Sequence, residues 1–469
     1  MNKRRRPNVL LIYTDQQRTD TLSCYGQEAI STPNIDALAK DGALFSKYFV
    51  QNPVCAPSRA SFLTGRYCSD LHIGTNGIVV PDEACPVQQI LSPYGYRTAQ
   101  LGKLHFEPHA RRNHQNPPKT YGFDTFILSD EPGCYDDAYT KWVEFHAPDQ
   151  VEKVRTMIPP AAVMWGRKGY SEVPRNTHEP YCFEGEAEYT HTAFVTSQTV
   201  EYLEKQTADT PFFAIAGYYA PHPPLNPPKK YVDMVDRSKL RLPLLGKEEK
   251  MEPYLADVTD EQWKDIQAHY LAMVIQVDEG VGQLVQTLKD KNLYDDTLII
   301  FTSDHGEFLG DHGRIQKGMP GHDCITNVPC ILSYPNGIKG NVRFDTLVEA
   351  VDIVPTILDY CGIQIPEFVR GKTLSPLLKG VTTEHRGSAL TEFFDSYQGR
   401  QTTVRTAEYK YYMHENGNEL LYDLGKDPNE LSNVANEPAY EYTKLKMQAL
   451  MMKRIQHASY HGLQRTDEY

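Results

Sequence analysis

Residues Asn52 to Tyr67 read NPVCAPSRASFLTGRY, and the rest of the chain can be organised around them. Pro57 suits the first turn of a helix, where a missing N–H costs nothing, and Gly65 suits the position just past the helix end. Cys55 is therefore expected at a helix N-terminus. The free N–H groups and the positive dipole end found there favour an anionic tetrahedral group, such as a sulfate or phosphate ester. A lone cysteine before a helix is more often simply buried, so it is the spacing of its neighbours that favours a site.

This stretch resembles the signature of the type I sulfatases, Cys-x-Pro-Ser-Arg followed by Ala-Ser-x-x-Thr-Gly-Arg, here Cys55 to Arg59 and Ala60 to Arg66. The resemblance implies that Cys55 is converted to formylglycine by a formylglycine-generating or anaerobic sulfatase-maturing enzyme. One hydroxyl of the hydrated aldehyde would attack sulfur, and the other would expel the sulfate as the carbonyl re-forms. Arg59, at i+4, is expected on the helix face of Cys55.

The composition limits the classes of partner. At 469 residues the chain can hold one large domain with a smaller one, or about three domains. The formal net charge of −13 argues against a nucleic-acid partner. An anionic substrate must then be drawn in by a local cluster of cations.

The N-terminus and the cysteines bear on location. The apolar run Val9 to Tyr13 behind the basic N-terminus is too short for a signal-peptide core or a membrane span. Nine cysteines without paired spacing fit a reducing compartment better than a disulfide framework. We therefore expect a cytoplasmic protein without a membrane partner, and the sequence indicates no oligomeric state.

Several apolar runs typical of buried strands end on chemically useful residues. Helices expected near Thr32–Gly42, Ala193–Lys205 and Glu261–Lys291 alternate with these runs, which predicts a mostly parallel α/β sheet. Ligands of such sheets bind outside the carboxyl ends of the strands. The run from His105 to about Thr190 shows no clear period and is expected to be a loop region. The runs and the residues that follow them are Asn8–Thr14 with Asp15 and Gln16, Tyr96–Leu101 with Lys103 and His105, Phe212–Tyr218 with His222, and Thr297–Thr302 with Asp304 and His305.

The sulfatase resemblance extends along the chain through Thr32–Asp36, Val351–Thr356 and Leu421–Leu424. It implies an alkaline-phosphatase-like fold, with a mostly parallel sheet flanked by helices. We expect a catalytic α/β domain over residues 1–384 and a smaller C-terminal α+β subdomain over residues 385–469. Alternating patterns at Glu408–Met413 and Glu419–Asp423 predict antiparallel strands there, followed by a helix from about Pro438.

Asp15, Gln16, Asp304 and His305 are candidate ligands of one divalent cation, with the Cys55 side chain completing the shell. Three oxygen donors and one imidazole suit Ca²⁺, Mg²⁺ or Mn²⁺, and the resemblance favours Ca²⁺. Taken singly, Asp15 could be a helix cap and His305 a core histidine. Their positions at the ends of two buried strands favour a shared site.

The resemblance places five further residues around this metal: Arg59, Lys103, His105, His222 and Lys317. It implies that Lys103 and Lys317 bind the sulfate oxygens, while His105 orients the nucleophile and helps to expel sulfate. His222, with Lys317, would protonate the leaving alcohol, a task suited to a side chain whose unperturbed pKa is about 6.5. Read singly, the lysines could be solvated charges and the histidines loop packing residues.

The function expected from these residues is hydrolysis of a sulfate monoester. The substrate expected first is a sulfated mono- or oligosaccharide, with aryl or choline sulfate behind it. His109, Arg111, Arg112 and His114 could meet a uronate carboxylate, although a solvated loop explains them as well. Two alternatives stay open: a phosphonate monoester or phosphodiester hydrolase of the same superfamily, and a catalytically silent binding protein.

Overall fold

A central sheet of eight strands organises the computed structural model, which describes residues 6–109, 113–114, 116, 119–155 and 179–459. The strands run in the order β5-β4-β6-β1-β7-β8-β2-β9, and β8 alone is antiparallel to its neighbours. The bounds are β1 (Asn8–Thr14), β2 (Gly42–Phe45), β4 (Arg97–Gly102), β5 (Thr125–Leu128), β6 (Phe212–Gly217), β7 (Thr297–Ser303), β8 (Cys330–Ser333) and β9 (Val342–Phe344).

The middle strand β1 explains why the apolar runs are continuous. All of its residues are buried, because it pairs in parallel with β6 on one side and β7 on the other. Leu10 lies opposite Ala214, and Leu11 lies opposite Ile300. Alternate side chains enter the cores on the two faces of the sheet, which leaves no polar face to break the run.

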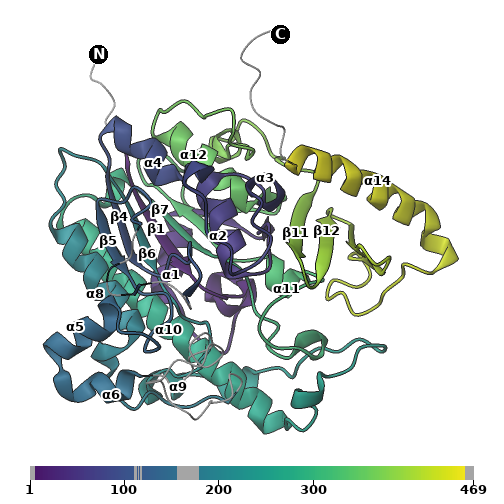
Figure 1. Cartoon of the computed structure of the whole chain (residues 1–469), viewed down its shortest axis with the longest axis horizontal. Coiled ribbons are helices and arrows are strands. Elements are labelled where there is room, and N and C mark those ends of the chain that lie inside the picture. The colour runs from purple at the N-terminus through teal and green to yellow at the C-terminus, as the bar shows by residue number, and fades with distance from the viewer. Residues whose placement is uncertain (1–5, 110–112, 115, 117–118, 156–178, 460–469) are drawn as a thin grey trace.

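Helices cover both faces of this sheet (Figure 1). On one face pack α1 (Pro33–Lys40), α8 (His191–Glu204) and α10 (Asp260–Asp290). On the other pack α2 (Cys55–Thr64), α4 (Val87–Leu91) and α12 (Ile353–Tyr360). The long α10 begins with a capping box in which Thr259 and Gln262 satisfy each other's backbone N–H groups.

The segment expected to be a loop region contains regular structure in its described part. Besides β5, it holds α5 (Ala138–His146) and α6 (Val151–Val154). The Asp137 side chain caps α5 by accepting from the Thr140 N–H. These elements are short and partly exposed, so they leave little periodic signal. Smaller elements elsewhere are β3 (Tyr48–Phe49), β10 (Val348–Glu349), α3 (Cys68–Leu71), α9 (Lys229–Val232), α11 (Asp323–Thr326) and α13 (Ser375–Leu378).

A four-stranded antiparallel sheet follows, with α14 (Glu441–Ala458) packed along it (Figure 1). Its strands are β11 (Ala389–Asp395), β12 (Gly399–Arg405), β13 (Tyr409–His414) and β14 (Glu419–Asp423). Met447 and Met451 of α14 pack against Val404, Tyr411 and Leu421 of the sheet. The expected fold class is thus confirmed, while the division at residue 384 stays a prediction.

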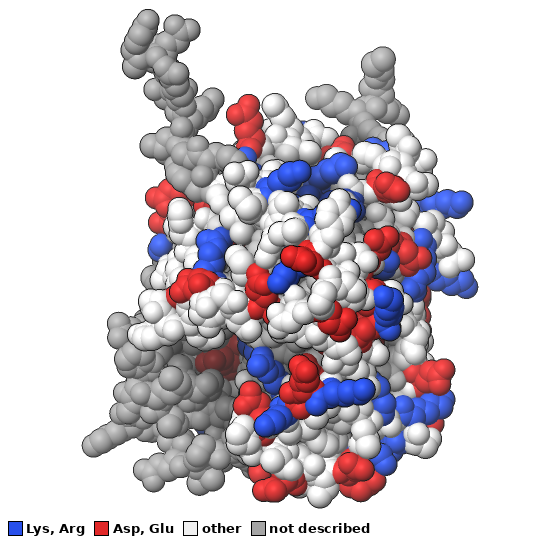
Figure 2. Space-filling view, turned by 90° about the vertical axis from the view of Figure 1, so that its right-hand side faces the viewer, with Lys and Arg blue, Asp and Glu red and all other residues white. Residues whose placement is uncertain are grey.

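Two further features bear on the sequence expectations. Among the described residues, no helix is both long and apolar enough to cross a membrane. Figure 2 shows acidic and basic side chains interspersed over the face that carries α14. All nine cysteines are free thiols. The cellular location stays a prediction.

Candidate active site

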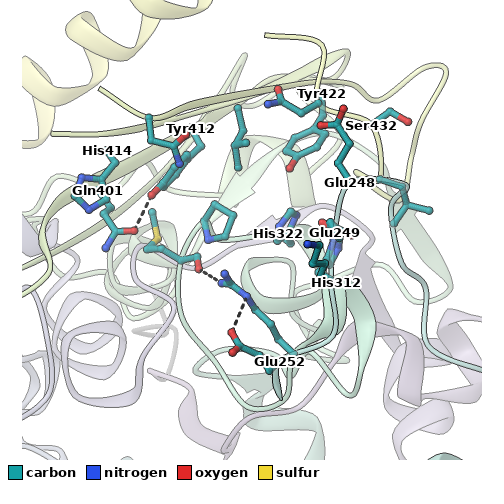
Figure 3. Close-up of a pocket in the computed structure, with 18 of the residues that line it drawn as sticks. Glu248, Glu249, Glu252, His312, His322, Gln401, Tyr412, His414, Tyr422 and Ser432 are labelled. Atoms are coloured by element: carbon teal, nitrogen blue, oxygen red, sulfur yellow. Dashed lines mark hydrogen bonds and ion pairs between the residues drawn. The ribbon is translucent and has the colours of Figure 1, made fainter. Parts of the chain in front are cut away.

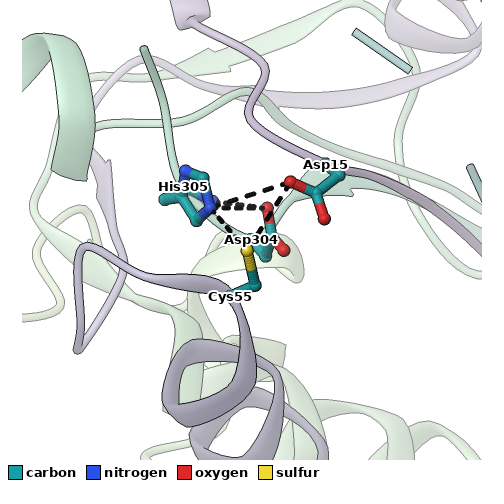
Figure 4. A group of neighbouring side chains, drawn as sticks. All are labelled: Asp15, Cys55, Asp304 and His305. Atoms are coloured by element: carbon teal, nitrogen blue, oxygen red, sulfur yellow. Dashed lines mark hydrogen bonds and ion pairs between the residues drawn. The ribbon is translucent and has the colours of Figure 1, made fainter. Parts of the chain in front are cut away.

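Four buried side chains meet at the carboxyl ends of β1 and β7 (Figure 4). Asp15 follows β1, Asp304 and His305 follow β7, and Cys55 is the first residue of α2. One potential ligand atom from each of the four lies within 4.8 Å of the others. Because β1 and β7 are parallel neighbours, their ends deliver these groups to one point, as the sequence predicted.

The helix that carries Cys55 is fixed at both ends. Gly65 ends α2 in the left-handed conformation at φ +66°, and its N–H donates to the Ser61 carbonyl over 3.0 Å. A Cβ at this position would lie 2.9 Å from Val369 Cγ1, so no other residue fits without movement. At the other end, the Ser58 hydroxyl donates to the Asp304 carbonyl oxygen over 2.5 Å. Cys55 is thereby held against the residues that follow β7.

The imidazole of His305 is oriented as a metal ligand. Its Nδ1 lies 2.8 Å from the Gly306 carbonyl oxygen, so Nδ1 carries the proton and Nε2 presents its lone pair to the site. Nε2 lies 3.2 Å from Cys55 Sγ, and 3.7 Å from an oxygen of each of Asp15 and Asp304. Burial lowers the pKa of His305, but Asp304 and Cys55 outweigh it and leave the pKa above its usual value.

Gln16 supplies a further oxygen. Its backbone has φ +65°, which is uncommon for a residue other than glycine. The side-chain Nε2 donates to the Glu307 carboxylate, while Oε1 is buried and has no hydrogen-bonding partner among the described residues. A buried orphan oxygen beside two carboxylates and an imidazole fits a divalent cation that prefers oxygen ligands.

Arg59 lies beneath the carboxylates rather than open to a substrate. Its side chain is 1% exposed, with Nε 2.7 Å from Asp304 Oδ2 and Nη2 3.3 Å from Asp15 Oδ2. Nη1 also donates to the Lys103 carbonyl oxygen over 3.1 Å. The guanidinium therefore neutralises and positions two candidate metal ligands. The sequence spacing to Cys55 did not reveal this role.

Two lysines approach the same site from different strands and loops. Lys103, after β4, is 2% exposed and places Nζ 2.6 Å from Asp15 Oδ2. Lys317 places Nζ 2.8 Å from Cys55 Sγ. Burial and Asp15 raise the pKa of Cys55, but Lys317, Lys103 and His305 outweigh them and lower it. Burial also raises the pKa of Asp15, yet Lys103 and the other cations nearby hold it well below its usual range.

His222 forms a pair with Lys317. The distance between Lys317 Nζ and His222 Nε2 is 3.0 Å, and His222 Nδ1 lies 2.6 Å from the Pro223 carbonyl oxygen. Nδ1 thus carries the proton, and Nε2 accepts from the ammonium group. Burial and Lys317 hold the pKa of His222 well below its usual value.

His105 lies on the other side of Lys103 with a backbone φ of +58°. Its Nδ1 is buried without a partner among the described residues, and its N–H donates to Asp130 Oδ1 over 2.9 Å. Its ring lies 4.0 Å from that of His109. Burial, His109 and Lys103 hold the pKa of His105 well below its usual value, so the ring is neutral near pH 7.

The suggested patch from His109 to His114 is not a surface cluster in its described part. His109 is buried, with Nδ1 3.0 Å from Glu131 Oε1, and the His114 ring stacks on Tyr135 at 3.6 Å. Arg111 and Arg112 lie outside the described residues.

Sequence reasoning missed three residues that support the site. Glu307 holds the Gln16 amide, Asp130 accepts from the Leu104 and His105 N–H groups, and the Tyr219 ring lies 4.6 Å from Lys103 Nζ. Glu307 follows Asp304 by three positions and could have been noticed from that spacing. Asp130 follows the short strand β5, which gave no signal.

A buried cluster of carboxylates, surrounded by cations and facing a side chain at a helix N-terminus, suits the hydrolysis of an anionic ester. The family model described as Sulfatase matches residues 7–363, and the model described as N-sulphoglucosamine sulphohydrolase, C-terminal, matches residues 310–457. The chain belongs to the sulfatase family, whose members are sulfuric ester hydrolases.

Individual relatives span nearly the whole chain. An arylsulfatase from Clostridium perfringens is 29% identical over 477 residues, covering 96% of this chain and 95% of its own length. An ulvan-active sulfatase from Formosa agariphila is 28% identical, with coverage of 96% and 81%. Among solved structures, the phosphonate monoester hydrolase of Agrobacterium radiobacter is similar with a TM-score of 0.81, 28% identity and 96% coverage of each chain.

Proposed function

We propose that this enzyme hydrolyses a sulfate monoester of a carbohydrate, using formylglycine formed from Cys55 and one Ca²⁺ ion. The observation that carries the proposal is the surroundings of Cys55 Sγ, with Lys317 Nζ at 2.8 Å, His305 Nε2 at 3.2 Å and Asp15 Oδ1 at 3.8 Å. A group at this position contacts a candidate metal shell and an ammonium donor together. That arrangement suits a nucleophile that attacks an anion.

Asp15, Gln16 Oε1, Asp304 and His305 Nε2 would hold the cation. When bound, Ca²⁺ would offset the charge of the ester and orient its oxygens. A hydrated aldehyde at position 55 would supply the attacking hydroxyl. Arg59 keeps the two carboxylates in place from below, since its guanidinium contacts both of them.

The cations of this chain act on the sulfate and on the leaving oxygen. Lys103 and Lys317 carry N–H groups that can bind sulfate oxygens, which gain charge in the transition state. Lys317 donates to His222 Nε2, so this pair can pass a proton to the leaving alcohol. The neutral ring of His105, whose Nδ1 has no partner among the described residues, can orient the hydroxyl groups at position 55.

The relatives support a carbohydrate ester without deciding it. They include the ulvan-active sulfatase and an N-acetylglucosamine-6-O-sulfatase from Bacteroides thetaiotaomicron, which is 24% identical. They also include the arylsulfatase and a choline-sulfatase from Rhizobium meliloti, which is 27% identical. A panel of sulfated sugars against aryl and choline sulfates separates these classes, and activity on the last two alone would rule out the carbohydrate.

A second candidate is hydrolysis of phosphonate monoesters or phosphodiesters, favoured by the structural likeness to the Agrobacterium enzyme. A phosphodiester and a sulfate monoester each carry one negative charge, but the diester has a second organic arm, so its pocket needs more room. A sulfate monoester has one arm and three oxygens that several fixed donors can bind together. The buried ammonium group of Lys103 beside Asp15 adds one such donor and therefore favours the monoester.

Kinetics of the Lys103→Ala variant test this choice. We expect kcat/KM for 4-nitrophenyl sulfate to fall by about 10²–10³, because one electrostatic donor is lost. A 4-nitrophenyl phosphodiester should be affected less, and Lys141→Ala, on an exposed lysine, should change neither rate. A wild-type preference for the diester, or a silent Lys103→Ala variant, would reject the sulfate monoester as the preferred substrate.

The modification and the metal are tested separately. Mass spectrometry of the Cys55 peptide from the native host should show formylglycine, and a catalytically silent protein would carry plain cysteine without turnover. After chelation, Ca²⁺ should restore activity better than Mg²⁺ or Mn²⁺ does.

A further inference from the structure

A large cleft lies between the loop of residues 247–252, the segment of residues 312–322 and the strands β12, β13 and β14 (Figure 3). Its volume of about 910 Å³ is at the upper end of what a whole small-molecule site occupies. Most of its lining side chains are polar or charged, among them Glu249, Gln401, His414 and Asn418. Such a wall suits a ligand rich in hydroxyl groups better than an apolar one.

Two histidines on this wall are held as a stacked pair. The rings of His312 and His322 lie 3.6 Å apart with an angle of 10° between their planes. His312 Nδ1 lies 2.8 Å from Glu249 Oε1, and His322 Nδ1 lies 3.2 Å from Glu430 Oε2. The carboxylates therefore fix the proton on Nδ1 of each ring. Both Nε2 atoms have no hydrogen-bonding partner in the part of the chain that the structure describes.

These rings are nearly buried, at 8% exposed for His312 and 4% for His322. The two Nε2 atoms are therefore hydrogen-bond acceptors held in fixed positions, as in a preorganised binding site. Glu249, His312 and His322 could also be considered as metal ligands, since their donor atoms lie within 4.8 Å of one another. Stacked rings, however, direct their Nε2 lone pairs along parallel planes, whereas ligands of one ion must converge on it.

The cleft adjoins the active site through one short segment. Lys317, whose Nζ contacts Cys55 Sγ, is five residues from His312 and five from His322. Five residues of extended chain span at most roughly 18 Å. Met319 of this segment belongs to an apolar cluster with Tyr412 on the cleft wall, and Val54, which precedes Cys55, packs against that cluster. The distance from Lys317 to the two histidines is one that a chain of sugars with its ester at Cys55 can extend over, whereas a small aryl or choline ester is too short.

The charges on the cleft are mixed. The acidic residues Glu248, Glu249, Glu252 and Glu437 accompany the basic residues Lys247, Lys250 and Arg314. Arg314 lies 3.8 Å from Glu252 and donates to the Met319 carbonyl oxygen over 2.8 Å. This balance does not select a polyanion. It favours hydrogen bonds to neutral groups.

We propose that this cleft binds the sugar residues that flank the sulfated one in an oligosaccharide, with His312 Nε2 and His322 Nε2 accepting hydrogen bonds from their hydroxyl groups. The proposal rests on the proposed function and extends it from a sulfated sugar to a chain of sugars. Tyr397, which is 94% exposed on the turn between β11 and β12, adds an aromatic face at the rim. Binding energy from these remote residues would be used at the reacting centre.

Calorimetric binding to the Cys55→Ala protein, which cannot turn over, tests the proposal. The probes are disaccharides and hexasaccharides prepared from ulvan, κ-carrageenan and heparan sulfate. In at least one series we expect the hexasaccharide to bind at least tenfold more tightly than the disaccharide, a gain in affinity with chain length. His312→Phe keeps a ring to stack on His322 but removes both nitrogens, and it should reduce this gain about five- to tenfold. His322→Ala should act in the same direction, while His146→Ala, an exposed histidine on α5, should leave the gain unchanged.

Each other outcome contradicts the proposal. No gain with length in any series, or a gain that survives both His312→Phe and His322→Ala, would show that the cleft does not bind the chain. A gain that disappears in about 1 M salt, where the Debye length is roughly 3 Å, would mean that charge is bound instead. Stoichiometric Zn²⁺ binding that is lost in both variants would make the pair a metal site. Turnover of 4-nitrophenyl sulfate by the mature enzyme reports on the proposed function separately, because that ester does not reach the cleft.

Discussion

Glu307 determines which end of the Gln16 amide faces the candidate metal shell. Its side chain is buried, and one carboxylate oxygen accepts from Gln16 Nε2. The other oxygen accepts from the Leu309 N–H over 3.1 Å and from the Gln316 N–H. Burial raises the pKa of Glu307 above its usual value, and these donors offset only part of that effect. An acceptor in this place leaves Gln16 Oε1 free to bind a cation.

Glu307→Gln should therefore weaken the metal site without changing its shape. A glutamine of the same size has one acceptor oxygen, so its NH₂ group would face a donor. We expect the affinity for Ca²⁺, measured by calorimetry, to fall about 10- to 100-fold, as for other residues that orient metal ligands. Glu252→Gln is the matched control, because that carboxylate contacts Arg314 at 3.8 Å outside the site. Unchanged affinity in Glu307→Gln would refute the orienting role.

At the scale of elements, Asp352 links the start of α12 to the segment that leads into β11. It is fully buried, with Oδ2 2.7 Å from Arg386 Nε and 3.0 Å from His385 Nε2. Oδ1 accepts from the Lys372 N–H over 2.7 Å. Burial raises the pKa of Asp352, but Arg386 and His385 outweigh it and hold the pKa well below its usual value.

This carboxylate should make the protein sensitive to acid. A depressed folded pKa contributes stability that is present above the unfolded pKa of about 3.9 and is lost as the pH falls toward the folded pKa. Denaturant unfolding from about pH 6 to pH 3 should show a flatter acid limb in Asp352→Asn. Near neutral pH the variant should lose at most about 3–5 kcal/mol, since Arg386 loses one of its two buried carboxylate partners and keeps Glu349 at 3.1 Å. Asp82→Asn, which changes an exposed carboxylate 3.0 Å from Lys119, is the control and should match the wild type. If stability falls equally with acid in all three proteins, Asp352 is not the source of the acid sensitivity.

Sequence patterns predicted best the elements whose apolar pattern extends over many residues. β1 and β7 are continuous apolar runs, and α10 repeats its apolar residues at three and four positions, so their bounds agree to within a residue. The convergence of Asp15 and Asp304 followed from the geometry of parallel strand ends. Short elements were missed. The helix expected to stop at Gly42 does end at Lys40, but the strand β2 that begins at Gly42 was missed, because four residues that pair with distant parts of the chain carry no local period.

The roles that sequence reasoning missed depend on contacts between distant segments. Glu307 acts through a turn that brings Gln316 back to it, and Arg59 acts through carboxylates that follow two other elements. Neither partner is indicated by spacing along the chain. Motif spacing finds which residues gather at a site, whereas the side-chain partner of each is set by the packing around it.

At the scale of the whole molecule, the C-terminal sheet is built into the support of the active site. The Glu392 N–H of β11 donates to the Gln51 carbonyl oxygen over 2.8 Å. The Asn52 side chain donates to the Glu392 carbonyl oxygen over 2.6 Å, three residues before Cys55. From α14, Arg454 contacts both oxygens of the fully buried Glu349 at 2.7 Å. Buried hydrogen bonds and an ion pair therefore join the C-terminal sheet and α14 to the rest of the chain, in addition to apolar contacts.

Removal of residues 385–469 should therefore unfold the rest of the chain and not release a working domain. Gln51, Asn52 and Glu349 would each lose a buried partner, at about 1–3 kcal/mol for a neutral group and 3–5 kcal/mol for a charge. Together these losses approach the whole stability of a typical domain, about 5–15 kcal/mol. We expect one calorimetric transition for the full chain, and no cooperative transition or Ca²⁺ binding for residues 1–384. Two separate transitions, or a truncated chain that melts cooperatively and binds Ca²⁺, would show instead that the catalytic part folds independently, because its buried polar groups would then find other partners.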